Sequence, residues 1–365
     1  MNHKLRSLGF AALAAVWLLL VVFAWFGKPT DISEAERRPL AKFPEISGEE
    51  ILNGNFMKDF EDYSLDQFPL RDTFRQIKAL FHYNALNQAD NNNIYIADGY
   101  AVKQEYPLNE TSVNHALKRF NFLHSKYLKG SNIYMAIVPD KGYYLAEENS
   151  QLALDYEALF AMMEEGMPWA THVDLTGTLS ADSYYRTDTH WRQEMLLPAA
   201  GALCDAMGVT APKAEDFSQI KLDRPFYGVY YGQAALPMDP DDLVYLQSDL
   251  LKGCTVTNFE NGKRTQIYDM NKLSSKDLYD VFLSGATALL TIDNPNASTN
   301  RELIVFRDSF GSSMIPLLVQ DYRTVTVIDI RYVQPEFLGQ VVNFHGQDVL
   351  MLYSTLILNS SSVLR

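Results

Sequence analysis

The feature that most limits how this chain can fold is a run of nineteen apolar residues near its start. Residues 8–26 read LGFAALAAVWLLLVVFAWF and carry no charge. A helix of this length spans the hydrocarbon core of a bilayer. Because Lys4 and Arg6 precede the run, the positive-inside rule predicts that residues 1–27 are a cytoplasmic tail and a transmembrane signal anchor. A cleaved signal peptide is the alternative, and both interpretations place the rest of the chain outside the cytoplasm.

The composition of the whole chain excludes several classes of function. The 365 residues carry a net charge of −14, and 47% of them are hydrophobic, which is enough for a sizeable core. An acidic surface repels phosphate backbones, so nucleic acid is not an expected partner. No glycine-rich phosphate loop is present, and we expect no cofactor. Cys204 falls in an apolar helical run, and we interpret it and Cys254 as free thiols rather than a disulfide or zinc ligands.

Three segments follow the predicted anchor. Residues 28–50 are polar and contain prolines, which is typical of a juxtamembrane linker. Residues 51–92 have apolar side chains at helical spacing, and they predict a helical extension of two amphipathic helices broken near Pro69. We expect these helices to pack on the main domain rather than on a membrane surface. At residue 93 the pattern changes, and IYIADGYAV predicts a hairpin around Asp98-Gly99.

Residues 93–365 show continuous apolar strands alternating with helices. The predicted strands are NIYMAIVPD, RELIVFRDSF, TVTVIDI and DVLMLYSTL, and a helix, SSMIPLLVQDY, follows the second of them. Strands that are apolar at every position are buried on both faces, as in a parallel sheet between two layers of helices. The sequence therefore predicts an α/β fold with a mostly parallel sheet.

A serine stands at the end of one predicted strand. In open parallel sheets, sites form beyond the carboxyl ends of the strands. Ser309 follows the apolar residues 303–306 and precedes the predicted helix, where backbone N–H groups can stabilise an oxyanion. Alternatively, Ser309 only caps the helix, with Ser312 or Ser313 as competing caps. Position 307 is arginine, so this is not the lipase elbow G-x-S-x-G.

A serine hydroxyl needs a base, and His190 is the best-placed histidine. It lies in YYRTDTHW, residues 184–191, two residues after Asp188. In an extended or turn segment the carboxylate can accept the Nδ1–H, which leaves Nε2 as the base. The alternative is that Asp188 caps a helix with His190 in its first turn. A metal site would need a third ligand close by, and none is evident, so we expect no metal.

Several ordered motifs resemble the bacterial DHHW protein family. The strongest are YYRTDTHW and IVFRDSFGSSMIPLL. Others are ERRPLAKFPEIS, DQFPLRDTF, IVPDKGYYLAE, FYGVYYGQ, LYDVFLSG, VIDIRYVQPE and DVLMLY, so the resemblance covers most of the exported chain. The family is similar to the AlgJ/AlgX-type alginate O-acetylation proteins. The resemblance implies that residues 93–365 form an SGNH-hydrolase-like three-layer sandwich. It places the nucleophile on Ser309, the base on His190 and the orienting acid on Asp188. Thr189 stands where the family name implies histidine, as in the alginate-type members.

The resemblance also implies a function. It points to an O-acetyltransferase that modifies an exported cell-surface polysaccharide through an acetyl-serine intermediate. A membrane-bound O-acyltransferase would be the partner that supplies acetyl groups, since acetyl-CoA is not expected outside the membrane. The alternatives are a carbohydrate O-acetylesterase with the same triad and a non-catalytic glycan-binding or scaffolding subunit. Triad residues do not separate transferase from esterase, because the difference lies in acceptor binding and water exclusion.

Further residues are candidates for oxyanion or substrate binding. The backbone N–H of Ser309 is the first candidate oxyanion donor. Gly228 in FYGVYYG could offer a second N–H, and an ordinary turn glycine is the alternative. Lys141 and Tyr143 follow a predicted strand and could line the cleft. Arg307 could bind an acidic sugar or pair with the aspartate that follows it.

Overall fold

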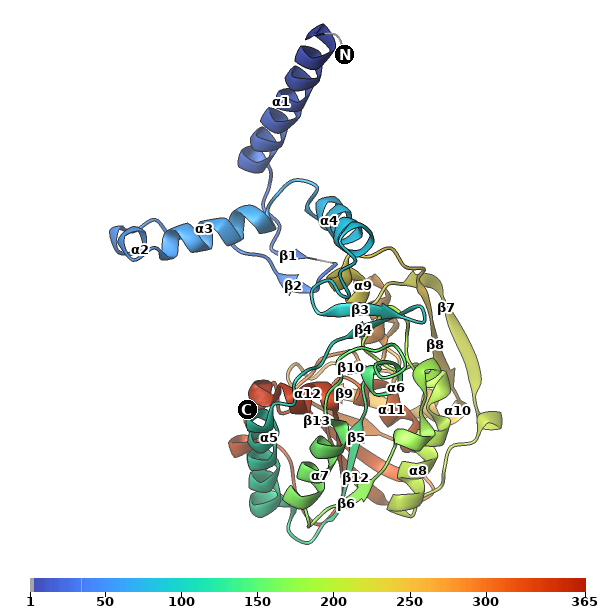
Figure 1. Cartoon of the computed structure of the whole chain (residues 1–365). Helices are drawn as coiled ribbons and strands as arrows, with labels where there is room; N and C mark the ends of the chain where they lie inside the picture. The colour runs from blue at the N-terminus through green and yellow to red at the C-terminus, as the bar shows by residue number, and fades with distance from the viewer. Residues whose placement is uncertain (1–2, 34) are drawn as a thin grey trace. The chain divides into compact units, whose positions relative to one another are not determined.

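The computed structural model describes residues 3–33 and 35–365 (Figure 1). The chain divides into two compact units. The first comprises Met1–Asn92 and Val229–Met238, and the second comprises Asn93–Gly228 and Asp239–Arg365. Nothing in the sequence pattern predicts that Val229–Met238 belongs with the N-terminal residues. The four-segment division predicted above stays a prediction.

The first unit is mainly helical. Its longest helix, α1 (His3–Phe26), contains the segment Ser7–Ala24, with a mean hydropathy of 2.5, which is long and apolar enough to cross a membrane. The two amphipathic helices expected after residue 51 are confirmed, and the break between them includes Pro69. The remaining elements are β1 (Ile32–Ser33), β2 (Arg38–Pro39), α2 (Gly48–Leu52), α3 (Asn55–Asp66), α4 (Arg71–Ala85) and α9 (Val229–Ala234).

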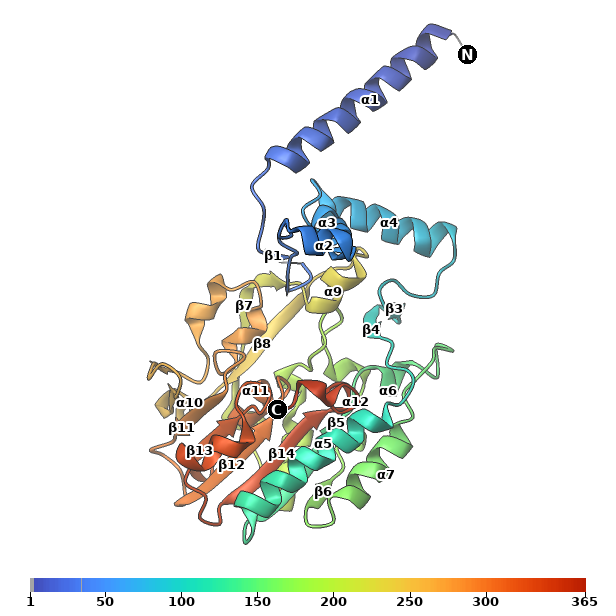
Figure 2. The same cartoon turned by 90° about the vertical axis from the view of Figure 1, so that its left-hand side faces the viewer.

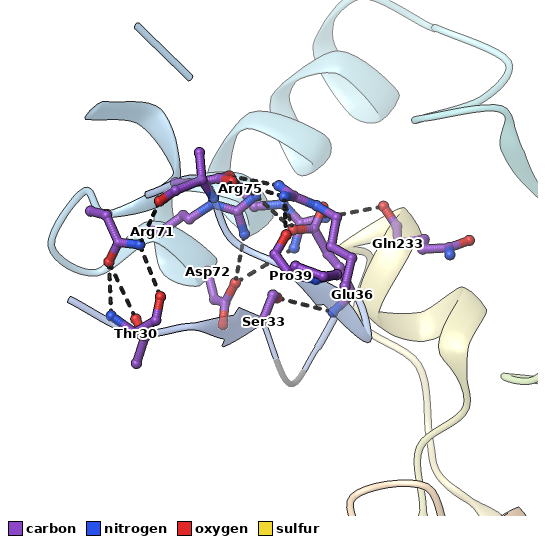
Figure 3. Close-up of polar contacts among 12 residues, drawn as sticks. Thr30, Ser33, Glu36, Pro39, Arg71, Asp72, Arg75 and Gln233 are labelled. Carbon is purple, nitrogen blue, oxygen red and sulfur yellow. Dashed lines mark hydrogen bonds and ion pairs between the residues drawn. The ribbon is translucent and has the colours of Figure 1, made fainter. Parts of the chain in front are cut away.

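Ion pairs and hydrogen bonds connect the separate segments of this first unit (Figure 3). Glu36, between β1 and β2, lies 2.6 Å from Arg71 and 3.1 Å from Arg75 on α4. Arg75 also donates a hydrogen bond of 2.9 Å to the carbonyl oxygen of Gly232 on α9. A single arginine therefore joins the N-terminal hairpin, α4 and α9, which explains why Val229–Met238 belongs to this unit.

The second unit is built on an eight-stranded sheet with the order β10-β9-β11-β13-β12-β14-β5-β6 (Figure 2). The five strands from β13 to β6 run parallel, whereas β11, β9 and β10 pair antiparallel. The predicted mostly parallel sheet is confirmed. Its strands are β5 (Asn132–Val138), β6 (Thr171–Val173), β9 (Thr255–Asn258), β10 (Arg264–Thr265), β11 (Leu289–Asp293), β12 (Arg301–Arg307), β13 (Tyr322–Ile328) and β14 (Asp348–Ser354).

Helices cover both faces of this sheet (Figure 1). On one face α5 (Glu110–Leu123), extended by a π-helical turn (His124–Leu128), and α7 (Tyr156–Gly166) bury Ile304 and Met351. On the other face α8 (Leu197–Met207) buries Val305 and Leu352. Because successive strand residues point to opposite faces, both members of each neighbouring pair are buried. The predicted three-layer sandwich is confirmed.

Short elements surround the three layers. The hairpin expected around Asp98-Gly99 is confirmed, since both residues have positive φ, 48° and 83°, as a tight hairpin turn requires. The two cysteines are buried free thiols, as expected. The short elements are β3 (Ile94–Ala97), β4 (Tyr100–Lys103), α6 (Gly142–Leu145), β7 (Ser218–Phe226), β8 (Asp241–Gln247), α10 (Asp249–Gly253) and α12 (Thr355–Asn359).

The helix expected over residues 312–322 is shorter than predicted. It consists of α11 (Gly311–Met314), one turn long, and a 3₁₀ turn at Ile315–Leu318. Pro316 has no N–H to donate, and its ring opposes a continuing α-helix, so the apolar run does not extend the helix. The helix after Ser309 is thus too short to contribute a substantial helix dipole. The expectation that the N-terminus of a long helix stabilises an oxyanion at Ser309 is therefore wrong.

Candidate active site

Ser309 lies on a turn directly after β12, at the carboxyl edge of the parallel strands. The Asp308 carboxylate fixes this turn by accepting hydrogen bonds from the Phe310 N–H at 3.0 Å and from the Ser354 N–H and hydroxyl at 2.7 and 2.6 Å. Ser354 is the last residue of β14, so two neighbouring strand ends hold one turn. Asp308 and Phe310 are buried while Ser309 is partly exposed. The turn therefore presents the serine hydroxyl.

Asp188 and His190 lie on a second turn, whose backbone is closed by a 3.1 Å hydrogen bond from the Tyr185 N–H to the His190 carbonyl. The Asp188 carboxylate lies 2.6 Å from His190 Nδ1 and also accepts the His190 backbone N–H at 3.0 Å. His190 Nε2 lies 2.8 Å from Ser309 Oγ. These partners assign the proton to Nδ1, which leaves Nε2 to accept from the serine hydroxyl. The structure thus brings the three predicted residues into one hydrogen-bonded chain.

The geometry also excludes the two alternatives in which Ser309 or Asp188 only caps a helix. The N-cap of α11 is Phe310 and no side chain caps it, so Ser309 is not a helix cap. The first helical turn after His190 is the 3₁₀ turn Gln193–Met195, so Asp188 does not cap a helix with His190 in its first turn. The Ser309 and Asp188 side chains instead both belong to the hydrogen-bonded chain through His190. Asp188 is fully buried and His190 is 6% exposed.

Two side chains join the turn that carries Asp188 and His190 to the turn that carries Ser309. The indole N–H of Trp191 donates to the Phe310 carbonyl at 3.0 Å, and the Gln193 side-chain amide donates to the Ser313 carbonyl at 2.8 Å. The sequence motif YYRTDTHW includes this tryptophan, but its role depends on the fold. These bonds fix the distance between the two turns and so between His190 and Ser309.

Gly228 supports Asp188 rather than an oxyanion. Its N–H donates to the Thr187 hydroxyl at 2.9 Å, so it is not available to a reacting carbonyl oxygen. A Cβ at this position would lie 2.3 Å from the Asp188 Cα. Glycine is therefore required because the Asp188 backbone occupies the space a side chain would fill. This corrects the prediction that Gly228 donates to an oxyanion.

Lys141 and Tyr143 do not line the triad. The Lys141 ammonium is buried and donates to the carbonyls of Tyr185 and Arg186, at 3.0 and 3.4 Å, so it supports the Asp188–His190 segment from within. Burial lowers its pKa to about 7, against the opposing effect of nearby aspartates. Tyr143 packs edge-on against Tyr156 and lines a separate hollow with residues such as Phe160. The expectation that the two residues line the cleft is wrong.

Arg307 is also inside the protein. Its guanidinium is fully buried, donates to the carbonyls of Asp308 and Gly285 at 3.2 and 3.1 Å, and lies 3.8 Å from the Asp329 carboxylate. Burial lowers its pKa, and Asp329 opposes that effect. Arg307 therefore cannot reach a sugar at the surface, and its ion-pair partner is Asp329 rather than the neighbouring aspartate. Both parts of the prediction for this residue are corrected.

The backbone N–H of Ser309 remains the candidate oxyanion donor. Within residues 3–33 and 35–365 it makes no hydrogen bond, whereas the N–H groups of Asp308 and Phe310 on either side are both paired. An unpaired N–H on the partly exposed Ser309 is the kind of donor that can bind a developing negative charge.

One residue that the sequence does not single out is Tyr279. It belongs to the segment LYDVFLSG, which matches the family pattern without indicating a role for the tyrosine. Its ring is stacked on the His190 imidazole, with ring centres 3.9 Å apart and an angle of 7° between the planes. Only the tertiary structure brings these two rings together.

Solved structures of other proteins have a similar fold. A DHHW protein from Eubacterium siraeum shares 22% identity over 73% of this chain and 92% of its own, with a TM-score of 0.59. PatB1 of Bacillus cereus, solved with a sulfonyl adduct, shares 16% identity over 73% and 97%, with a TM-score of 0.58. No curated protein sequence is significantly similar to the chain. The family model for DHHW proteins matches residues 175–328, which include Asp188, His190 and Ser309. The resemblance to the DHHW family that the sequence indicated is thus confirmed over residues 175–328.

Proposed function

We propose that this protein transfers O-acetyl groups to an exported cell-surface polysaccharide through an acetyl ester on Ser309. The observation that carries the proposal is the hydrogen-bonded chain from Asp188 through His190 Nε2 to Ser309 Oγ, with distances of 2.6 and 2.8 Å. Such an arrangement lets a serine hydroxyl lose its proton to the imidazole as it attacks an acyl group.

The reaction would proceed in two half-reactions. In the first, Ser309 Oγ attacks the carbonyl carbon of an acetyl donor while His190 Nε2 takes the hydroxyl proton. The Ser309 N–H stabilises the oxyanion, and His190 returns the proton to the leaving group as the donor ester bond breaks. In the second, a sugar hydroxyl attacks the acetyl-serine while His190 accepts its proton. The bond between the acetyl carbon and Ser309 Oγ then breaks, and His190 passes the proton to Oγ, which restores the free serine and releases the acetylated sugar.

The choice of a polysaccharide acceptor rests on the resemblance to the alginate O-acetylation proteins. The same resemblance supports a membrane-bound O-acyltransferase as the acetyl supplier, and the long apolar helix α1 is consistent with a site held near a membrane. The sulfonyl adduct in the structure of PatB1 is relevant because sulfonyl reagents trap activated nucleophiles. An esterase would use the same residues with water as acceptor.

The test uses the full-length protein in detergent micelles with 4-nitrophenyl acetate. Wild type should release a burst of 4-nitrophenol and carry an acetyl group on the peptide containing Ser309, and a sulfonyl fluoride should block both. Ser309→Ala should abolish the burst, whereas Ser312→Ala, a serine on the adjacent helical turn, should retain it. An equal rate for wild type and Ser309→Ala would refute the catalytic role.

A second measurement separates transferase from esterase. Oligosaccharide acceptors added to the acetylated protein should speed turnover and become acetylated if the proposal is correct. Free acetate produced at a rate independent of the acceptor would instead identify an esterase. An absence of acyl-serine with any activated ester would favour the non-catalytic glycan-binding or scaffolding subunit.

A further inference from the structure

A tyrosine lies face to face with the proposed base. Tyr279, in the 3₁₀ turn Leu278–Val281, has its ring centre 3.9 Å from that of His190, and the two planes are within 7° of parallel. Phe310 contacts the imidazole at a tilted angle, with ring centres 5.1 Å apart. The imidazole is therefore enclosed by aromatic rings, and one of them covers a whole face.

The tyrosine ring is held in place by its other contacts. Its hydroxyl forms a 2.7 Å hydrogen bond with the Ser313 hydroxyl on α11, the helix that follows the nucleophile turn. Its ring packs against Phe282 and edge-on against Tyr185, with ring centres 5.0 and 6.4 Å apart. Tyr279 is 3% exposed. It therefore connects the base to the segment that carries the nucleophile.

An aromatic face has a specific effect on a neighbouring cation. The negative face of the ring attracts a charge centred within about 6 Å, and the attraction is largest where water is excluded. When Ser309 gives up its proton, His190 becomes an imidazolium directly over this face. The other charged groups around the pair are Asp188 on the histidine segment, Asp308 and Arg307 on the nucleophile turn, and Lys141 behind Asp188.

We propose that Tyr279 is a positioning residue for His190, and that its ring holds the imidazole plane with Nε2 toward Ser309 and stabilises the imidazolium formed during acyl transfer. This inference rests on the proposed function. The proton that moves is the Ser309 hydroxyl proton, which binds Nε2 while Ser309 Oγ bonds to the acyl carbon. The tyrosine hydroxyl takes no part in this step, because it is committed to Ser313.

The experiment compares three substitutions in the full-length protein. Tyr279→Phe retains the aromatic face and loses the bond to Ser313, Tyr279→Leu loses the face, and Phe282→Leu is the matched packing control because Phe282 is equally buried and touches Tyr279. The first measurement is the rate of Ser309 acylation by 4-nitrophenyl acetate as a function of pH. The second is the NMR titration of the His190 imidazole, which needs no activity.

We expect the rate of acylation and the two pH midpoints to depend on whether position 279 keeps an aromatic ring. Tyr279→Leu should slow acylation by about tenfold and move the acid limb of the pH profile, with the NMR midpoint, about one pH unit lower, because the imidazolium loses its stabilising face. Tyr279→Phe should keep both midpoints at the wild-type values. Phe282→Leu should lower the melting temperature without moving either midpoint.

Other outcomes would overturn the inference. Identical midpoints for Tyr279→Leu and Phe282→Leu would show that Tyr279 only fills space. If Tyr279→Leu does not fold, pentafluorophenylalanine at position 279 keeps the ring shape and removes its negative face, and unchanged midpoints in that protein would refute the inference. Failure of the proposed function looks different, since wild type would then form no acyl-serine while the NMR titrations would still report the effect of the ring.

Discussion

The Asp188 carboxylate accepts two hydrogen bonds from one histidine, at the backbone N–H and at Nδ1. Both bonds go to Oδ1, and in asparagine the amide nitrogen can take the place of this oxygen, donate to Nδ1 and so favour the wrong tautomer of His190. We expect Asp188→Asn to reduce the rate of Ser309 acylation by about 10³- to 10⁴-fold. The burst of 4-nitrophenol measures this loss. Asp205→Asn on the exposed side of α8 serves as the control, and a wild-type rate in Asp188→Asn would exclude the orienting role.

Gly228 leaves open the space that the Asp188 backbone occupies. A Cβ there would lie 2.3 Å from the Asp188 Cα, so the Asp188 backbone must move to accept it. We expect Gly228→Ala to lower the free energy of unfolding by about 1–3 kcal/mol, the usual cost of overpacking, and to reduce acylation together with it. Urea denaturation measures the first effect and the burst assay the second.

Gly201 on α8 provides the matched control for this substitution, since a Cβ there meets nothing within 4 Å. Gly201→Ala should raise the free energy of unfolding by about 0.5–1 kcal/mol, because alanine is the better helix former. Equal stabilities of the two alanine variants would contradict the steric account of Gly228.

At the scale of the element, strand β8 supports the turn that carries Asp188 and His190. Its first residue, Asp241, accepts the Arg186 N–H at 2.9 Å and the Thr187 N–H and hydroxyl at 2.8 and 2.5 Å. Asparagine has one acceptor atom where this arrangement uses two oxygens. We expect Asp241→Asn to cost about 1–3 kcal/mol of stability through the unpaired buried donor and to lower acylation.

The neighbouring residue of β8 supplies the control for Asp241. Asp242 forms an exposed ion pair with Lys221 at 2.7 Å, and both side chains are about 60% exposed. Such surface pairs contribute little, so Asp242→Asn should leave the melting temperature and acylation unchanged. If the two variants behave alike, β8 does not hold the turn that carries Asp188 and His190.

The elements differ in how far the sequence predicts them. The central strands β5, β12, β13 and β14 are mostly buried and rich in apolar or β-branched residues, so each can be recognised without the fold. The strand β10 at the sheet edge and its neighbour β9 span only two and four residues, and such short patterns are ambiguous. The apolar run after Ser309 suggests more helix than Pro316 permits.

The residues of the candidate site also differ in how far the sequence predicts them. Asp188 and His190 are two residues apart and Ser309 follows an apolar strand, so local sequence indicates all three. Tyr279 reaches His190, and Gly228 reaches Asp188, only when distant segments are folded together. The buried positions of Lys141 and Arg307 reverse the usual expectation that charged side chains beside a site face the solvent. Their contacts could not be predicted from spacing alone.

For the whole molecule, one buried lysine should make stability depend on pH. Burial lowers the pKa of Lys141 from 10.5 to about 7, so between these values the unfolded chain binds more protons than the folded one. The free energy of unfolding should therefore rise with pH from about 7, by at most about 1.4 kcal/mol per unit. Above about pH 9 it should fall, because burial raises the pKa of Cys204 and Cys254 from 9 to about 12 and about 11.

Urea denaturation between pH 6 and pH 10 tests this profile. Lys141→Met should remove the rise between pH 7 and pH 9, whereas Lys129→Met, which replaces an exposed lysine, should leave it in place. A rise that persists in Lys141→Met would have to come from other groups.

The helix α1 gives a prediction about the location of the whole protein. Ser7–Ala24 is apolar enough to span a membrane, and Lys4 and Arg6 precede it. We expect the full-length protein to fractionate with membranes and to resist extraction by high salt, whereas a chain beginning at residue 28 should remain in the supernatant. A mature protein that begins near residue 25 would identify a cleaved signal peptide instead of an anchor.

If the chain is exported, its two buried cysteines limit the time that it has to fold. Cys204 and Cys254 lie in the same core cluster, out of reach of oxidants once the sandwich has formed. A chain that crosses the membrane unfolded arrives with both thiols exposed, in a compartment where disulfides form within seconds to hours. A bond formed in that interval would join two residues whose native places are separate sites in the core. In an oxidising compartment the thiols stay reduced when the sheet and its helices assemble before the oxidant reacts, so a disulfide in the mature protein would mark a chain that folded too slowly.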